Sequence, residues 1–194
     1  MAQHTANASV VVSAPAHQVF ALWSHFNDFP KFMRHVREVT YYDEQRSHWV
    51  VDVLGLHEWD AVNENWIEGR QIGWRSTDGL ENRGVVTFDP VDDSQTRITV
   101  QVTYDPPGGV VGDVVNSLGG GVTFENALQE DLNHFGRLVA EAGPGALDPH
   151  SSNYLFHRDS AAAQGTTTPA QNETMDEDDA EFLANNPPLT GTRR

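Results

Sequence analysis

The sequence predicts an α+β fold in which a curved antiparallel sheet of about seven strands wraps around one long C-terminal helix. Short runs rich in β-branched and aromatic residues, separated by turn residues, fill the chain from 36 to 104. Beyond them, apolar residues recur at helical spacing from 124 to 139. A sheet with one apolar face and a helix with one apolar stripe can bury those surfaces against each other.

The elements follow in the order β-αα-β6-α. The first are a strand at 9–14, a helix that begins near Pro15 and a short helical or turn segment at 29–33. Six strands come next, at 38–42, 47–54, 56–66, 71–76, 83–88 and 97–104. Because the links between them have hairpin length and turn chemistry, we expect antiparallel neighbours.

The last strand and the helix after it define the two packing surfaces. In the strand, the apolar residues from Ile98 to Tyr104 alternate with polar ones, which indicates one covered and one solvated face. The segment 104–109 then stops the sheet with two prolines and two glycines. Helical spacing also covers 110–118, and Gly119-Gly120-Gly121 interrupts it, either as a hinge or as a plain break between helices.

Charge and composition exclude several classes of function. The formal net charge is −16, with 9 basic and 20 acidic residues up to Ala142 (−11), and 3 and 8 after it (−5). Such a field repels nucleic acid and anionic membrane surfaces, so neither is an expected partner. The acidic balance fits either a high-salt environment or a GC-rich genome.

No cysteine is present, which excludes disulfides and thiolate metal sites. The first residues carry neither a basic nor an apolar targeting region, and no run is long enough to span a membrane. We therefore expect a cytoplasmic protein without stable membrane insertion.

The chain divides into a domain at 1–142 and an acidic tail at 143–194. Gly143-Pro144-Gly145 stops the helix, and the tail is rich in Ala, Gln, Thr, Asn and Pro. A tail of this composition is expected to be disordered. Phe182-Leu183, beside the acidic run at 176–179, could bind a protein partner, although a solvated tail is the simpler interpretation.

A series of short motifs occurs in a characteristic order between residues 9 and 142. They are Ala14-Pro15, Val19-Phe20, Phe29-Pro30-Lys31-Phe32, Trp49-Val50-Val51, Gly55, Glu58-Trp59-Asp60-Ala61, Ile72-Gly73-Trp74-Arg75-Ser76, Gly84-Val85-Val86-Thr87-Phe88, Thr96-Arg97-Ile98-Thr99-Val100, Tyr104-Asp105-Pro106-Pro107-Gly108-Gly109 and Glu130-Asp131-Leu132-Asn133-His134-Phe135. This order resembles the SRPBCC superfamily, specifically its START-like bacterial polyketide cyclase/dehydrase branch, which is similar to coenzyme Q-binding proteins. Gly136 departs from the branch, which usually has lysine there.

The resemblance implies a helix-grip fold that holds an apolar ligand in a cavity between the curved sheet and the long helix. It implies no particular reaction, because one fold hosts many functions. The candidate cavity residues are Phe20, Phe32, Trp49, Val51, Trp59, Trp74, Val100, Tyr104, Leu118, Phe124 and Leu128. For the aromatic residues, ordinary core packing is the alternative.

Candidates for an acid or base are His57, Glu58, Asp60 and Arg75, with His57 and Asp60 the weak candidates for catalysis. Glu58 and Asp60 share a strand face that is more simply explained as polar exterior, and Arg75 has the parity of an outward residue. The scattered histidines show no metal-ligand spacing, and no nucleophile elbow or phosphate loop is present, so no metal or cofactor is expected.

Three functions remain open. The first is binding or carriage of a small hydrophobic molecule, such as a quinone, a lipid or a polyketide. The second is a cyclase or dehydrase that uses an acid or base in the cavity. The third is a protein-interaction module that recruits a partner through the acidic tail.

Overall fold

The structure is a computed structural model of the 194-residue chain, and it describes residues 3–53, 55–105, 123–143, 145–147 and 154–155. Within these ranges, the element order is β1 (His4–Val12), α1 (Ala16–Ser24), η1 (Phe26–Lys31), β2 (Val36–Tyr41), β3 (Arg46–Asp52), β4 (Leu56–Ile67), β5 (Gln71–Gly79), β6 (Asn82–Asp92), β7 (Gln95–Tyr104) and α3 (Phe124–Glu141).

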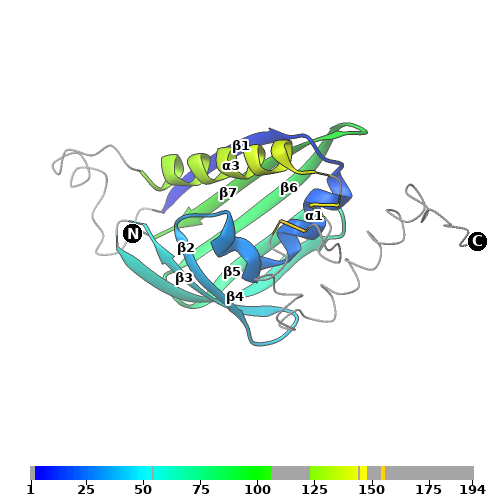
Figure 1. Cartoon of the computed structure of the whole chain (residues 1–194). Coiled ribbons are helices and arrows are strands. Elements are labelled where there is room, and N and C mark those ends of the chain that lie inside the picture. The colour runs from blue at the N-terminus through cyan, green and yellow to red at the C-terminus, as the bar shows by residue number, and fades with distance from the viewer. Residues whose placement is uncertain (1–2, 54, 106–122, 144, 148–153, 156–194) are drawn as a thin grey trace, which may run out of the picture.

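The strands form one seven-stranded antiparallel sheet in the order β1-β7-β6-β5-β4-β3-β2. Figure 1 shows the sheet curling around its inner face, with α3 lying along β1 and α1 near the far end of the strands. The predicted α+β helix-grip architecture and its β-αα-β6-α order are therefore confirmed, with the short second helix being the 3-10 helix η1.

The largest difference in extent between prediction and structure lies in β1. β1 begins at His4, five residues earlier than predicted, because its pairing with β7 continues as far as His4 opposite Tyr104. Leu54, Leu118, the rest of the predicted helical run at 110–118 and the triple glycine lie outside the described residues.

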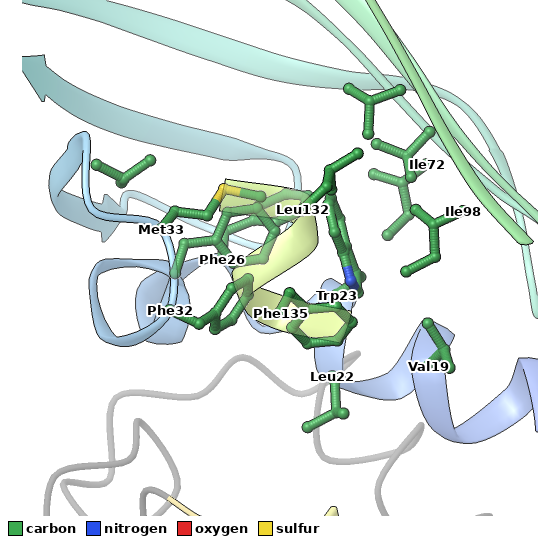
Figure 2. Packing of buried hydrophobic residues seen from close by; sticks show 14 of the residues in the cluster. Val19, Leu22, Trp23, Phe26, Phe32, Met33, Ile72, Ile98, Leu132 and Phe135 are labelled. Carbon is green, nitrogen blue, oxygen red and sulfur yellow. The ribbon is translucent and has the colours of Figure 1, made fainter. Parts of the chain in front are cut away.

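The core lies between the inner face of the sheet and the helices. Trp23 of α1 sits at its centre, with its ring in edge contact with Phe29, Phe88 and Phe135 at centroid distances of 5.3, 6.0 and 5.7 Å. Figure 2 shows Trp23 of α1, Phe135 and Leu132 of α3, and Phe32, which directly follows η1, converging on one another. Such aromatic contacts join the two helical layers into one packed body.

Helix α3 also covers the free edge of the sheet. The Gln129 side chain accepts a hydrogen bond from the Ser9 backbone N–H (3.2 Å) and donates one to the Ser9 carbonyl (2.9 Å). Glu125 accepts another from the Asn7 N–H at 3.0 Å. These side chains occupy backbone groups of β1 that a further strand would otherwise pair with.

The packed part of the chain continues past Ala142, where the sequence places the end of the domain. Ala146 and Tyr154 are only 5% and 4% exposed, and Tyr154 belongs to the main hydrophobic cluster. The Tyr154 hydroxyl also lies 3.5 Å from the buried carboxylate of Asp28. The polar composition of this region conceals these two apolar residues, and we propose that the folded unit includes them.

Among the described residues, no helix combines the length and apolar character that crossing a bilayer requires.

Candidate ligand site on the inner face of the sheet

The register of the sheet decides which strand side chains face α3. Val100, Val86 and Ile72 are neighbours across β7, β6 and β5, and all three are buried in the core between sheet and helices. Trp74 lies two residues beyond Ile72 on β5, so it points to the same inner face. Trp59 of β4 lies there too, because it shares the parity of Ala61, which is 2% exposed.

Trp49 and Trp59 form a stacked pair at the β3–β4 part of this face. They are directly opposite in the register, and their rings are almost parallel (5°) with centroids 5.9 Å apart. Trp49 also contacts Phe26 and Phe29 of η1 at 5.4 and 5.7 Å. The core thus supports the Trp49 ring, and stacking on Trp49 orients the Trp59 ring.

Trp74 continues the aromatic surface on β5. A Cβ on Gly84 of the neighbouring strand would fall 2.3 Å from the Trp74 ring, so the indole lies directly over this glycine. The Trp74 N–H donates to Asn82 Oδ1 at 3.0 Å, and the Asn82 amide donates to the Leu80 carbonyl at 2.9 Å. The missing side chain and the buried amide together set the position of the ring.

The helix contributes the opposite side of the site through Phe124 and Leu128, which are half-buried. Phe124 meets Tyr104 of β7 in an edge contact with centroids 5.0 Å apart. Burial raises the pKa of the Tyr104 hydroxyl, and the nearby Glu125 carboxylate raises it further, so this group is neutral and able to donate a hydrogen bond at physiological pH.

The predicted cavity residues divide by exposure. Trp49, Trp59, Trp74, Tyr104, Phe124 and Leu128 are half-buried. Phe20, Phe32, Val51 and Val100 are 1%, 2%, 7% and 2% exposed and belong to the closed core. A ligand would touch the first set without disturbing the packing, whereas contact with the second set needs the core to open.

His57 is the one candidate acid or base on the inner face. It lies opposite Val51 and two residues before Trp59, and it is half-buried. Neither of its ring nitrogens has a hydrogen-bond partner within the described ranges. Its imidazole is therefore available to a molecule bound on this face.

Asp60 and Glu58 point to the outer face, because each alternates with an inward residue of β4. Asp60 accepts hydrogen bonds from His48 Nδ1 (2.8 Å) and the Tyr42 hydroxyl (3.0 Å), and these bonds, chiefly that of His48, lower the pKa of its carboxyl. This placement removes Asp60 from the candidates for a base in the cavity. Arg75 is exposed, with its Nε 3.3 Å from Glu64 Oε2.

Over the residues that the structure describes, no group of three or more His, Cys, Asp or Glu side chains is placed to hold a metal ion.

Comparison with known proteins places the chain in a family. The model of the family described as "Polyketide cyclase / dehydrase and lipid transport" matches residues 12–129. An uncharacterised 17.2 kDa protein from the melC2–rnhH intergenic region of Streptomyces lincolnensis is 31% identical over 137 residues, which is 70% of this chain and 89% of that protein. The chain belongs to the polyketide cyclase/dehydrase and lipid transport family.

Solved structures agree with this assignment. DR_A0006 from Deinococcus radiodurans is 30% identical, with a TM-score of 0.55 over 70% of this chain and 95% of that one. A START superfamily protein from Mycobacterium smegmatis has the same fold, with 17% identity and a TM-score of 0.54 over 69% of this chain and 92% of that one. The predicted membership of the polyketide cyclase/dehydrase branch is thus confirmed by the family match, and the solved structures share its fold.

Within this family fold, sequence reasoning missed two polar residues of the site, Ser47 and Asn82. Both are buried on the inner face, at 2% and 6% exposure, and each accepts a hydrogen bond from a tryptophan of the site. Their parity could have revealed them, since Ser47 precedes Trp49 by two residues on the same strand. Asn82 lies across a hairpin from Trp74, and only the register brings the two together.

Proposed function

We propose that this protein binds a small apolar molecule between the inner face of its sheet and helix α3. The observation that carries the proposal is the aromatic surface of Trp49, Trp59 and Trp74, which lies on the inner face of the sheet and is only half-buried. Half-buried aromatic rings on the inside of a curled sheet still expose apolar area, and covering that area with a ligand contributes about 25 cal/mol of binding free energy per Å². Membership of a family named for polyketide cyclases and lipid transport supports the same function.

The surroundings of the tryptophans suit binding better than chemistry. On this face, Ser47 and Asn82 hold the indole groups of Trp49 and Trp74 by hydrogen bonds, and the Tyr104 hydroxyl can donate one to a ligand. Ligand sites with mostly apolar walls and a few fixed polar groups have this composition. The ligand classes that we propose are quinones, lipids and polyketides.

The test is a titration of the purified protein with apolar ligands, in which quenching of tryptophan fluorescence reports binding. Native mass spectrometry identifies any molecule that co-purifies with the protein. Leu128→Glu places a charge on the helix side of the site, so we expect it to abolish binding. Val11→Glu makes the same change on an exposed residue (45%) of β1 and should leave binding intact. Equal affinity of both variants for the ligand would refute the proposal.

A second function, cyclase-type catalysis, is favoured by His57 alone. An inward imidazole with unoccupied nitrogens could remove a proton from the carbon between two carbonyls, which is the step that starts an intramolecular aldol cyclisation. We expect the protein to accelerate deuterium exchange at that carbon of benzoylacetone, as followed by NMR. His57→Ala should abolish the acceleration, and Asp60→Asn, on the outer face, should retain it; the absence of acceleration in the wild type would exclude this function.

The third function, recruitment of a partner by the acidic tail, concerns residues outside the described ranges and stays a prediction.

A further inference from the structure

The two halves of helix α3 are held in different ways. The C-terminal half buries Leu132, Phe135 and Val139, which are 0%, 3% and 3% exposed and belong to the hydrophobic core. In the N-terminal half, residues 124–130, Ala127 is the one buried residue. Apolar packing therefore fixes the C-terminal half, whereas the position of the N-terminal half depends more on polar contacts.

Arg34, in the loop between η1 and β2, supplies one set of these polar contacts. Its Nη2 donates to Glu130 Oε2 at 2.8 Å, and its Nε lies 3.6 Å from Asp131 Oδ1. The Arg34 backbone N–H also donates to Asp131 Oδ1 at 3.2 Å. The side chain of Asp131 is 4% exposed, against 60% for Arg34 and 65% for Glu130. Arg34 thus compensates a carboxylate that has little access to water.

The edge of β1 holds the same part of the helix from the other side. Glu125 and Gln129 make three hydrogen bonds to the β1 backbone. Gln129 and Asp131 are two residues apart, so they project from nearly opposite sides of the helix. Because β1 and β2 are the two edge strands, the helix connects both edges of the curled sheet (Figure 1). A movement of the N-terminal half has to break one of these two connections.

The connection through Arg34 is the easier one to break. Separating the helix from β1 would uncover a strand edge, whereas separating it from Arg34 releases an exposed guanidinium and returns the Asp131 carboxylate to water. We propose that the ion pair of Arg34 and Asp131 is a latch: when it breaks, the N-terminal half of α3 turns away from the η1–β2 loop about its contacts with β1 and uncovers the inner face of the sheet. The latch does not depend on the proposed binding function, but the entry of a ligand on this side rests on it.

The chain contains no cysteine, so an introduced thiol reports the opening. Ala127→Cys places a thiol at a position that is 2% exposed, one turn before Asp131 on the same side of the helix. Its reaction with the neutral reagent 4,4′-dithiodipyridine should be about tenfold faster when Arg34→Gln is added, because the closed form loses its charged hydrogen bonds. Arg34→Lys keeps the charge without the planar fork and should give an intermediate rate. An unchanged rate in the glutamine variant would overturn the inference.

Gln129→Leu is the matched control on the β1 side. It removes hydrogen bonds that the closed and open forms share, so it should change the thiol reaction rate less than about twofold. Global unfolding breaks those bonds, so a thiol that reacts through global unfolding would react faster in this variant. Equal acceleration by Gln129→Leu and Arg34→Gln would therefore refute a local opening. Arg37→Gln removes an exposed ion pair with Asp52, away from α3, and should also change the rate less than about twofold.

The path of a ligand is tested by stopped-flow mixing with the neutral fluorescent probe N-phenyl-1-naphthylamine. Arg34→Gln should raise the association and dissociation rates of the probe by the same factor, about tenfold, because the latch breaks on both entry and exit. The Kd should then change less than about twofold. Wild-type rates in this variant would refute entry at the latch. Absence of binding to the wild type would contradict the proposed binding function, and the thiol measurement would still decide whether the latch exists.

Discussion

At the scale of single residues, the inner face depends on Gly84, which makes room for the Trp74 indole. A Cβ at this position would lie 2.3 Å from the ring and 2.9 Å from the Gln101 carbonyl oxygen. The ring is tethered to Asn82, so it cannot turn aside without losing a hydrogen bond. Backbone on one side and a fixed aromatic ring on the other leave space for a hydrogen atom only.

Gly84→Ala should therefore destabilise the protein by about 1–3 kcal/mol and displace Trp74. Urea unfolding gives the free energy, and a changed tryptophan emission spectrum reports the displaced ring. Gly143→Ala is the control, because no atom lies within 4 Å of a Cβ at that position. A Gly84 variant as stable as the Gly143 variant would show that the contact with Trp74 is not restrictive.

The second residue-scale prediction concerns Asp60, whose pKa is lowered chiefly by its hydrogen bond with His48. A carboxyl that is more acidic in the folded state stabilises the protein above the unfolded pKa of about 3.9. That contribution is lost as the pH falls through the lower, folded pKa. Wild type should thus exceed Asp60→Asn in stability at pH 5, and urea unfolding at decreasing pH should show the gap closing below about pH 4. An unchanged gap at pH 5 and pH 3 would contradict this assignment.

Parity in the sequence was enough to predict that Trp49 and Trp74 lie on one face with apolar neighbours. It could not predict that the Trp59 N–H has no hydrogen-bond partner among the described residues. That feature depends on which polar side chains the register brings to each indole, as with Asn82 and Trp74 across a hairpin. Hydrogen bonds between elements are set by pairing and curvature, and the local pattern contains neither.

At the scale of elements, α3 and β1 form a unit in which helix side chains replace a missing strand. Gln129 is the centre of this arrangement, because its amide both accepts from and donates to the Ser9 backbone. Asn133 accepts a further hydrogen bond from the Gln129 amide at 3.0 Å, one turn along the helix. The helix thereby protects the edge of the sheet and is itself fixed in orientation.

Gln129→Leu keeps the bulk of the side chain and removes both hydrogen bonds to Ser9. We expect a loss of about 1–2 kcal/mol in the free energy of unfolding. Faster amide exchange at Ser9 should accompany it, because its N–H loses its acceptor. Arg137→Ala, at an exposed position of the same helix, should change stability by less than about 0.5 kcal/mol. Retained protection of the Ser9 amide in the leucine variant would refute the role of Gln129.

The strands could be predicted within a few residues because turn chemistry marks their ends. β1 was the exception, since 4–8 is a polar and small-residue stretch with no β-branched signal apart from Thr5. Its extension depends on β7, which supplies backbone partners along the whole length. A strand end that is stabilised by pairing with a neighbouring strand need not contain residues with high β-propensity.

At the scale of the whole molecule, the sheet departs from regular pairing at several register shifts, two of which lie between β4 and β5. The β4–β5 register shifts between Asp60 and Ala61 and again between Glu64 and Ile67, and Asn65 has a positive φ of 53°. Bulges of this kind bend a strand and increase its twist. Figure 1 shows the curl of the sheet, with α3 on its concave side.

Tyr154, which follows α3 in the chain, belongs to the same hydrophobic core. Tyr154 packs into the core beside Asp28, whose carboxylate lies 3.4 Å from Lys31, the single lysine of the chain. Tyr154→Ala removes a ring that is 4% exposed, and we expect it to lower the free energy of unfolding by about 2–4 kcal/mol. Leu155→Ala, at a residue that is 39% exposed, should cost less than about 1 kcal/mol. Tyr154 lies beyond the predicted domain end at Ala142. If the two variants are equally stable in urea, Tyr154 does not contribute to the folded unit and the predicted end at Ala142 stands.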